Sequence, residues 1–311
     1  MLRLCLALAL FFSAVAPAAA ADKLTLLLDW FVNPEHAPLV VAQEKGYFAE
    51  QNLDVTLVPP SDPSAPPRLL AAGQGDIAIT YQPNLYLQVA EGLPVVRFGT
   101  LVDTPLNTVM ALENGPIRTL ADLKGKTVGY SIGGFEDILL KRMLETVGLS
   151  LSDVRLVDVN FALTPALLAG RVDAVVGAYR NFEATELALQ GKPARAFYPE
   201  EHGVPPFDEV IFIARKDELQ DDRLRRFLAA VEKADLFIAN HPDEAFALFT
   251  KSHPDLANEL NRRAYADTWP RLSKSPAGLD VARYERFGQF MKDEGLIKQA
   301  PPVADYAVAL H

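Results

Sequence analysis

Short apolar runs alternate with amphipathic segments along the N-terminal part of the chain. The pattern predicts strands at residues 24–28, 55–58 and 77–80. Between these strands it predicts two helices, one over residues 39–47 that is closed by Gly46 and one that ends at Gly73. Strands that alternate with helices are typical of a mostly parallel sheet that is covered by helices on both faces.

The same order of elements recurs further along the chain. Strands are predicted at residues 126–130, 155–159 and 174–177, with helices at 137–147 and 164–169. The recurrence predicts a second lobe that resembles the first.

One junction has similar residues in the two copies, with identical residues at four of eight positions. The segment LAAGQGDI at residues 70–77 aligns with LLAGRVDA at residues 167–174. In each segment a glycine takes the left-handed position that closes a helix, and an aspartate precedes a buried strand. A paired-lobe architecture follows from this repeat.

Two further apolar runs are expected to connect the lobes. Residues 109–112 are predicted to form a strand that crosses to the second lobe, and residues 209–214 the strand that returns. Two crossing segments make a hinge about which lobes close. We therefore expect lobe I at residues 22–107 plus 209–311 and lobe II at 108–208. The remainder is helical in pattern, with one apolar stripe formed by Leu224, Phe227, Leu228, Val231 and Leu236.

The first 21 residues have the pattern of a secretory signal peptide. Arg3 precedes an apolar run over residues 4–17, and a row of small residues at 18–21 predicts cleavage near Ala20–Ala21. The run is shorter than the roughly 20 apolar residues of a membrane span. Cys5, the only cysteine, lies inside this segment without a lipoprotein cleavage site before it. We expect a soluble periplasmic protein without disulfides, thiolate metal sites or a lipid anchor.

Charge narrows the possible partners. The chain has 30 Lys and Arg against 40 Asp and Glu, and removal of residues 1–21 takes away one Arg and no acid, which leaves 29 against 40, a net charge of −11. Such a surface repels nucleic acids and anionic lipids. We expect no nucleic-acid partner and a monomer.

Three motifs carry a family resemblance: LLLDW at residues 26–30, HAPL at 36–39 and AQEKGYF at 42–48. They resemble the N-terminal signature of the family that joins periplasmic proteins binding formylaminopyrimidine with the yeast-type enzyme that makes hydroxymethylpyrimidine phosphate. The similarity continues through LKGKTVGY at 123–130 and GRVDA at 170–174. It implies an α/β fold of the type II periplasmic-binding-protein class, with two lobes joined by two crossing strands.

The same resemblance separates carrier from enzyme. In the yeast-type enzyme, a lysine that holds pyridoxal phosphate and a histidine that is consumed as substrate follow the aspartate of the first junction. Those positions correspond to Thr80 and Asn84 here. Threonine cannot form a Schiff base and asparagine has no imidazole, so we expect a binding protein without a catalytic cofactor.

Candidate ligand-binding residues are those that follow the strands, because ligands in this architecture sit at the carboxyl ends of strands. Trp30, Tyr81 and Tyr179 either stack on a planar ligand or pack in the core.

The polar candidates could pair with the edge of a ligand. Glu183 is the first choice, and Asp29 the second, for pairing with the N–H and ring nitrogen of an aminopyrimidine; Glu183 could instead serve only as a helix N-terminal acid. His36 is either a helix cap or a site donor, and Gly133-Gly134 either a turn or a receptor for a formyl or anionic group. Gln82 and Ser131 complete the set by position.

Together with these residues, the resemblance implies the solute-binding component of an ABC transporter, with a membrane permease as partner. The expected ligand is a thiamine-precursor aminopyrimidine, formylaminopyrimidine or hydroxymethylpyrimidine. The alternatives are a carrier for sulfonate, nitrate or another small solute, which predicts a basic cleft, and a pyridoxal-phosphate-dependent enzyme.

Overall fold

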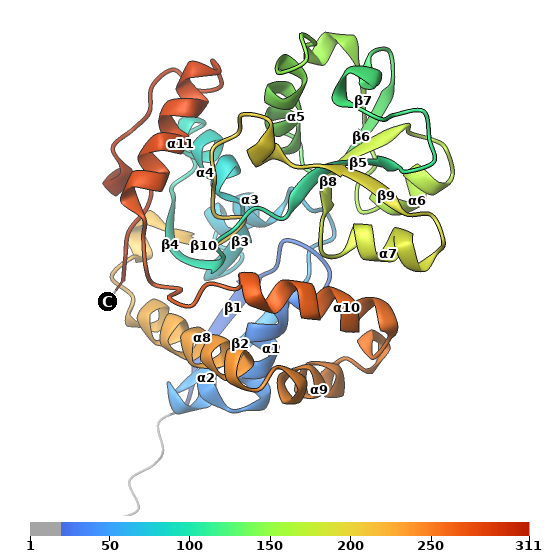
Figure 1. Cartoon of the computed structure of the whole chain (residues 1–311). Helices are drawn as coiled ribbons and strands as arrows, with labels where there is room; N and C mark the ends of the chain where they lie inside the picture. The colour runs from blue at the N-terminus through green and yellow to red at the C-terminus, as the bar shows by residue number, and fades with distance from the viewer. Residues whose placement is uncertain (1–19, 311) are drawn as a thin grey trace, which may run out of the picture.

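The computed structural model describes residues 20–310, and most of the predicted signal peptide lies outside these residues. Two five-stranded sheets, ordered β2-β1-β3-β10-β4 and β7-β6-β8-β5-β9, form two lobes (Figure 1). The predicted two-lobed α/β class is confirmed. Among the described residues, no helix is both long enough and apolar enough to cross a membrane.

Lobe I contains the first four strands, the tenth strand and most of the helices. Its strands are β1 (Asp22–Leu27), β2 (Leu53–Val58), β3 (Ile77–Thr80), β4 (Val95–Val102) and β10 (Val210–Arg215). Its α-helices are α1 (Ala37–Glu44), α2 (Tyr47–Glu50), α3 (Pro66–Ala71), α4 (Gln82–Ala90), α8 (Asp222–Asn240), α9 (Pro242–Ser252), α10 (Glu259–Thr268) and α11 (Val281–Asp293).

Lobe II lies between the two halves of lobe I in the sequence. Its strands are β5 (Asn107–Leu112), β6 (Thr127–Tyr130), β7 (Arg155–Asp158), β8 (Ala174–Tyr179) and β9 (Ala194–Phe197). Its α-helices are α5 (Glu136–Glu145), α6 (Leu163–Leu168) and α7 (Glu183–Leu189). Short 3-10 turns join several elements, among them η1 (Pro34–His36), directly before α1.

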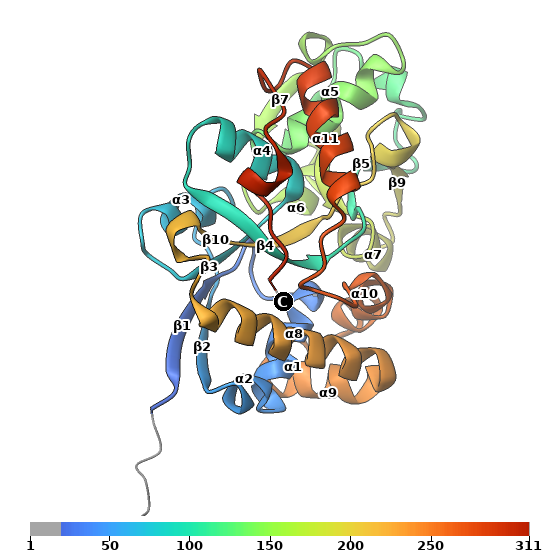
Figure 2. The ribbon, with the colours of Figure 1, turned by 90° about the vertical axis from the view of Figure 1, so that its left-hand side faces the viewer.

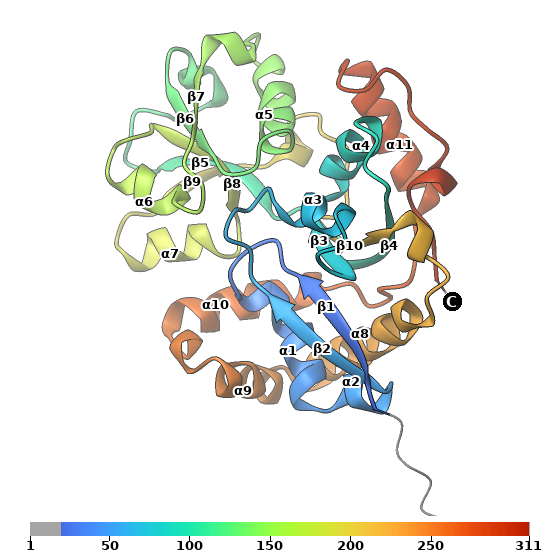
Figure 3. The same ribbon diagram turned by 180° about the vertical axis from the view of Figure 1, so that it is seen from behind.

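The lobe I sheet is buried on both faces. Alternate residues of β1 face opposite sides: Leu24 and Leu26 belong to the apolar cluster under α1 and α8, and Leu27 to the cluster under α4 and α11. Figure 3 shows α1, α2, α8 and α9 gathered at one end of this lobe, with α4 and α11 at the other. Because successive side chains of a strand point to opposite faces, the near-continuous apolar run of β1 fits a sheet covered twice.

In each sheet four strands run in one direction and one runs against them. In lobe I the reversed strand is β10, which pairs antiparallel with both β3 and β4. In lobe II it is β5, which pairs antiparallel with both β8 and β9. β5 is the first strand that the chain enters after residues 103–106 lead it into lobe II. β10 is the first strand after residues 198–209 lead the chain back into lobe I. The two sheets therefore have the same strand arrangement, and in each the reversed strand comes from the chain segment that enters from the other lobe.

The sequence repeat at the two junctions is a structural repeat. The Asp76 carboxylate accepts a hydrogen bond from the Thr25 N–H at 2.7 Å, and the Asp173 carboxylate accepts one from the Thr127 N–H at 2.8 Å. Asp76 therefore ties the start of β3 to β1, and Asp173 ties the start of β8 to β6.

Three expectations need correction. The runs at 109–112 and 209–214 form β5 and β10, which lie inside the sheets rather than between the lobes. Two strands of the structure, β4 and β9, were not predicted from the sequence. Leu236 is 48% exposed, because the buried stripe of α8 continues from Val231 to Asp235 and Ile238, the positions four and seven residues further on.

Candidate functional site

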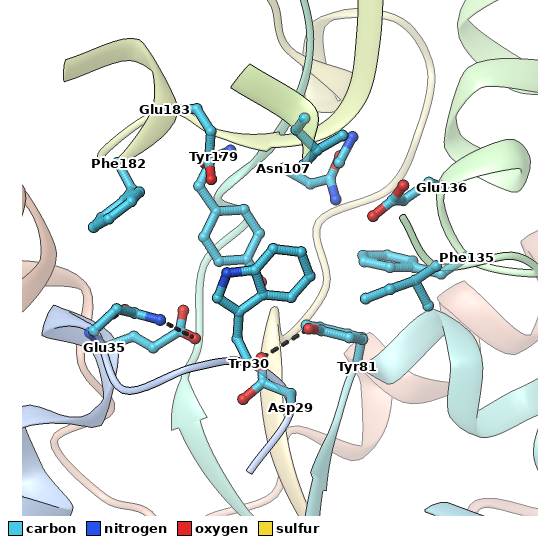
Figure 4. A pocket seen from close by; sticks show the side chains of 14 residues that line it. Asp29, Trp30, Glu35, Tyr81, Asn107, Phe135, Glu136, Tyr179, Phe182 and Glu183 are labelled. Carbon is cyan, nitrogen blue, oxygen red and sulfur yellow. Dashed lines mark hydrogen bonds between the residues drawn. The ribbon is translucent and has the colours of Figure 1, made fainter. Parts of the chain in front are cut away.

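A pocket lies between the lobes, at the carboxyl ends of β1 and β3 on one side and of β6 and β8 on the other. It encloses about 450 Å³ of empty space, which includes solvent at its mouth. Figure 4 shows Asp29 and Tyr81 at its base, Trp30 at its centre and Tyr179, Glu183, Asn107 and Glu136 on the opposite side. The residues that line it are Asp29, Trp30, Asn33, Glu35, Tyr81, Asn107, Ile132, Phe135, Glu136, Leu163, Gly177, Tyr179, Phe182 and Glu183.

Asp29, just beyond β1, is held by two side chains. Its Oδ2 accepts a hydrogen bond from the Tyr81 hydroxyl at 2.7 Å, and its Oδ1 lies 3.1 Å from His36 Nε2. The Asn33 N–H donates to His36 Nδ1 at 3.3 Å, so Nδ1 carries no proton and Nε2–H is the donor to Asp29. Burial opposes ionisation, but these hydrogen bonds outweigh it and lower the pKa of Asp29.

Glu35 is the second acid of lobe I at the pocket. Its Oε1 accepts a hydrogen bond from Asn33 Nδ2 at 3.1 Å, whereas its buried Oε2 has no partner among the described residues. Burial, and then the negative charge of Asp29, raise the pKa of Glu35 well above its usual value. The pKa values of the two neighbouring acids are therefore shifted in opposite directions, that of Asp29 downward and that of Glu35 upward.

Two Phe-Glu pairs place acids on the lobe II side. Phe135-Glu136 begins α5 and Phe182-Glu183 begins α7, and both phenylalanines have nearly the same backbone angles. Each glutamate folds back to accept a hydrogen bond from the end of the preceding strand: Glu136 from the Ser131 N–H at 2.6 Å, and Glu183 from the Tyr179 N–H at 2.7 Å.

Burial acts on both of these glutamates. It raises the pKa of Glu136 well above its usual value and the pKa of Glu183 to about 7. Gly177 makes the Glu136 position possible, because a Cβ at residue 177 would lie 2.2 Å from Glu136 Oε1.

Aromatic rings from both lobes meet around the pocket. Tyr81 of lobe I stacks on Phe135 of lobe II, with ring centroids 4.8 Å apart and planes inclined by 11°. Trp30 of lobe I meets Phe161 of lobe II edge to face at 4.6 Å. Tyr179 of lobe II packs against the apolar cluster under α1 and α8 of lobe I, and against the cluster under α4 and α11, to which both lobes contribute. Trp30, Tyr81 and Tyr179 thus come together at the inter-lobe gap, as the stacking hypothesis requires.

Five of the predicted residues line the pocket, and the other five lie outside it. His36 is fully buried behind Asp29, where it serves both as a cap of η1 and as the donor that orients this carboxylate. Gln82 is buried in lobe I, bonded to the Tyr86 hydroxyl and the Asp208 N–H. The Ser131 hydroxyl donates to the Asn160 carbonyl.

Gly133 and Gly134 border a separate hollow with residues of α3 and α4. They therefore do not face the pocket. A turn is the interpretation that this geometry supports for the pair.

Several lining residues were not identified from the sequence. The repeat of Phe-Glu after two buried strands is a signal that would have found Glu136 beside Glu183. Asn33, Glu35 and Asn107 carry no comparable signal, since none of them directly follows a predicted strand.

Asp29, Glu35 and His36 are close enough to share a metal ion, with donor atoms within 4.8 Å of one another. Most of these atoms are engaged within the protein: the Asp29 oxygens by His36 and Tyr81, and Glu35 Oε1 by Asn33. The arrangement is explained by these hydrogen bonds.

Comparison with known proteins supplies independent information. Residues 33–245 match the family model described as NMT1/THI5 like. A Haemophilus influenzae protein whose name places it in thiamine biosynthesis is 48% identical over 94% of each chain. The formylaminopyrimidine-binding protein of Halalkalibacterium halodurans is 39% identical over 73% of this chain and 69% of its own. A 4-amino-5-hydroxymethyl-2-methylpyrimidine phosphate synthase of Saccharomyces cerevisiae is 30% identical over 82% of this chain and 78% of its own.

Solved structures of similar fold include periplasmic binding proteins. The alkanesulfonate-binding protein SsuA of Xanthomonas axonopodis pv. citri, bound to MOPS, has a TM-score of 0.74 at 20% identity and covers 93% of this chain and 99% of its own. The periplasmic aliphatic sulphonate-binding protein SsuA of Escherichia coli has a TM-score of 0.67 at 18% identity, with 91% of each chain covered. At this identity the likeness shows the fold.

Proposed function

The chain belongs to the NMT1/THI5-like family, and from this premise we propose that it is the periplasmic solute-binding component of an ABC transporter for a thiamine-precursor aminopyrimidine. The proposed ligands are formylaminopyrimidine and hydroxymethylpyrimidine. The lobes close over the ligand, and the permease recognises the closed form because only that form presents both lobes in one fixed relation.

The observation that carries this proposal is the make-up of the pocket. Within residues 20–310, the lining contains four carboxyl groups and five aromatic rings but no lysine or arginine. An aminopyrimidine has a flat ring for the aromatic side chains and an edge with an N–H beside a ring nitrogen for a carboxyl group.

Glu183 is the acid best suited to read this edge. A protonated carboxyl with a neutral ring, or a carboxylate with a protonated ring, gives the same pair of hydrogen bonds, and a carboxyl with a pKa of about 7 can provide either. Asp29 is the weaker candidate, because each of its oxygens already has a partner in His36 or Tyr81.

The same make-up argues against the alternative of a sulfonate or nitrate carrier. An anion in this pocket would face the ionised Asp29 with no cationic side chain among the lining residues to offset its charge. The similarity of fold to sulfonate-binding proteins therefore does not carry their ligand over to this chain.

This chain differs from the synthase relatives at the two positions where the enzyme has its lysine and histidine. Thr80 lies buried in β3 and accepts a hydrogen bond from Gln88, and Asn84 borders the hollow beside Gly133. Neither lines the inter-lobe pocket, and neither has the chemistry of the lysine or histidine that the enzyme uses. An absorbance spectrum of the purified protein after addition of pyridoxal phosphate is expected to show no Schiff-base band.

A thermal-shift panel tests the ligand class. Formylaminopyrimidine and hydroxymethylpyrimidine are expected to raise the melting temperature in a concentration-dependent way, since a ligand that binds only the folded state stabilises it. Alkanesulfonates and nitrate are expected to leave it unchanged. Stabilisation by sulfonates without stabilisation by either pyrimidine would reject the proposal.

A further inference from the structure

Asn107 occupies a position that joins the pocket to the hinge. It begins β5, directly after the first crossover at residues 103–106, and it is 1% exposed. Its backbone N–H donates to Glu209 Oε2 at 3.1 Å, and the neighbouring Leu106 N–H donates to the same oxygen at 2.6 Å. Since Glu209 ends the second crossover, Asn107 is fixed against both segments that connect the lobes.

The orientation of the Asn107 amide is determined by its neighbour. Its Oδ1 accepts a hydrogen bond from the Gly177 N–H at 3.2 Å. A backbone N–H can only donate, so the oxygen must face Gly177 and the NH₂ group must point the other way.

That NH₂ group has no partner among the described residues, although it is buried at the pocket wall. A buried donor without an acceptor is costly, and native proteins rarely retain one without a reason. Figure 4 shows Asn107 between Tyr179 and Glu136, on the side of the pocket opposite Asp29.

The other amide of the pocket lining is already engaged. Asn33 Nδ2 donates to the Phe31 carbonyl at 3.2 Å and to Glu35 Oε1 at 3.1 Å. Gly133 and Gly134, the backbone donors that were candidates for receiving a formyl oxygen, border a different hollow. Asn107 Nδ2 is thus a neutral donor free to serve an acceptor on the ligand.

We propose that Asn107 Nδ2 donates a hydrogen bond to a carbonyl oxygen of the ligand and thereby selects an aminopyrimidine with a formyl group over one with a hydroxymethyl group. This inference rests on the proposed function. Carbonyl and hydroxyl oxygens both accept a hydrogen bond from an NH₂ group, so the selection rests on reach: the formylaminomethyl substituent extends further from the ring than the hydroxymethyl group. Because Asn107 is tied to both crossovers, the contact also places the ligand against the hinge.

Calorimetric titration of Asn107→Ala with the two pyrimidines tests the proposal. The variant is expected to lose about tenfold in affinity for formylaminopyrimidine, the loss typical of one neutral hydrogen bond in a buried site, and to change little for hydroxymethylpyrimidine. Asn107→Thr, which keeps an oxygen near Gly177 but lacks the NH₂ group, is the second variant in case the alanine variant does not fold.

Asn181→Ala is the matched control. Asn181 is also a buried asparagine of lobe II, but its Nδ2 already donates to Thr268 Oγ1 of lobe I at 2.6 Å, outside the pocket. Its replacement loosens closure and is expected to weaken both ligands to the same extent.

An equal loss for both ligands in the Asn107 variants, or no loss, would overturn the selective role of Asn107 and leave the proposed function intact. Wild-type protein that binds neither pyrimidine would instead contradict the proposed function itself, and this inference with it.

Discussion

The ionisation of Glu183 links ligand recognition to stability. Burial raises its pKa from 4.5 to about 7, so the folded protein holds this proton more tightly than the unfolded chain does. Unfolding therefore releases the proton between these two pH values, and the contribution of Glu183 to stability falls as the pH rises through this range. Above about pH 7 the penalty is complete.

Glu183→Gln is expected to remove this penalty. Relative to wild type, the free energy of unfolding of the unliganded variant should increase by about 1–2 kcal/mol from pH 5 to pH 8. This value is smaller than the full shift of the Glu183 pKa would give, because the side chain is half-buried. Affinity for the aminopyrimidine should fall in the same variant. Urea denaturation at the two pH values measures the first effect, with Glu91→Gln, an exposed glutamate of lobe I, as the control. A parallel pH dependence in wild type and the Glu183 variant would contradict the assignment.

Trp30 is the aromatic side chain that we propose contacts the ligand most directly. Its ring lines the pocket and touches Phe161 of lobe II edge to face, so it can contact ligand and opposite lobe together. Trp30→Ala is expected to weaken aminopyrimidine binding at least about tenfold, because stacking and apolar contact are lost together. Phe161→Ala, which alters the same ring contact outside the pocket lining, should cost less. Calorimetry would argue against a stacking role if the two variants bound equally well.

At the scale of elements, Gly177 controls how closely strand β8 approaches the start of α5. Its φ is +101°, and a Cβ there would lie 2.2 Å from the Glu136 carboxylate. Gly177→Ala is expected to lower the free energy of unfolding by more than about 2 kcal/mol, from backbone strain and displacement of Glu136 together.

Gly148 provides the control for Gly177. It also has a positive φ, +75°, but no atom lies within 4 Å of an added Cβ. Gly148→Ala should therefore cost only about 1 kcal/mol, the part that arises from backbone conformation. Equal losses of melting temperature in the two variants would show that the Glu136 contact does not matter.

The elements that the sequence predicted well are those with local signals. The two Gly-x-x-Asp junctions identified the paired lobes, and the structure shows the same hydrogen bond at Asp76 and at Asp173. Strand β4 was missed because its run VVRFGTLV contains an arginine and a glycine. Arg97 is buried there only because carbonyls of residues 278 and 308, far away in the sequence, accept its hydrogen bonds.

The residues of the candidate site likewise divide into those with a local sequence signal and those without one. Asp29, Trp30, Tyr81, Tyr179 and Glu183 follow strands directly, and the rule that ligands sit at strand ends found them. Glu35 and Asn107 became visible only in three dimensions, since their significance lies in unpartnered atoms at a surface that two distant segments share.

For the whole molecule, closure is supported on both flanks of the pocket by helices of lobe I. On one flank Glu294, just after α11, forms ion pairs with Lys141 and Arg142 of α5. On the other flank α10 meets α7 through the hydrogen bond between Thr268 and Asn181. Figures 1 and 2 show α11 beside α5 and α10 beside α7 in two perpendicular views.

Glu294→Gln is expected to weaken ligand binding two- to fivefold at low salt, the range for one partly exposed ion-pair cluster, and less at high salt because the charges are screened. The reason is that the ion pairs bridge the lobes and stabilise only the closed form. Glu259→Gln is the control, since Glu259 pairs with Arg262 and Arg263 within α10 alone. Calorimetry at two ionic strengths measures both; an equal effect of the two variants would rule out a role for the Glu294 ion pairs in closure.

A crystal structure with formylaminopyrimidine tests the central claim most directly. We expect the pyrimidine ring between the lobes, in van der Waals contact with the Trp30 indole, with its amino edge within hydrogen-bond distance of Glu183 or Asp29. A ligand bound outside the pocket that these residues line, or bound there with its amino edge facing no carboxyl group, would contradict the account.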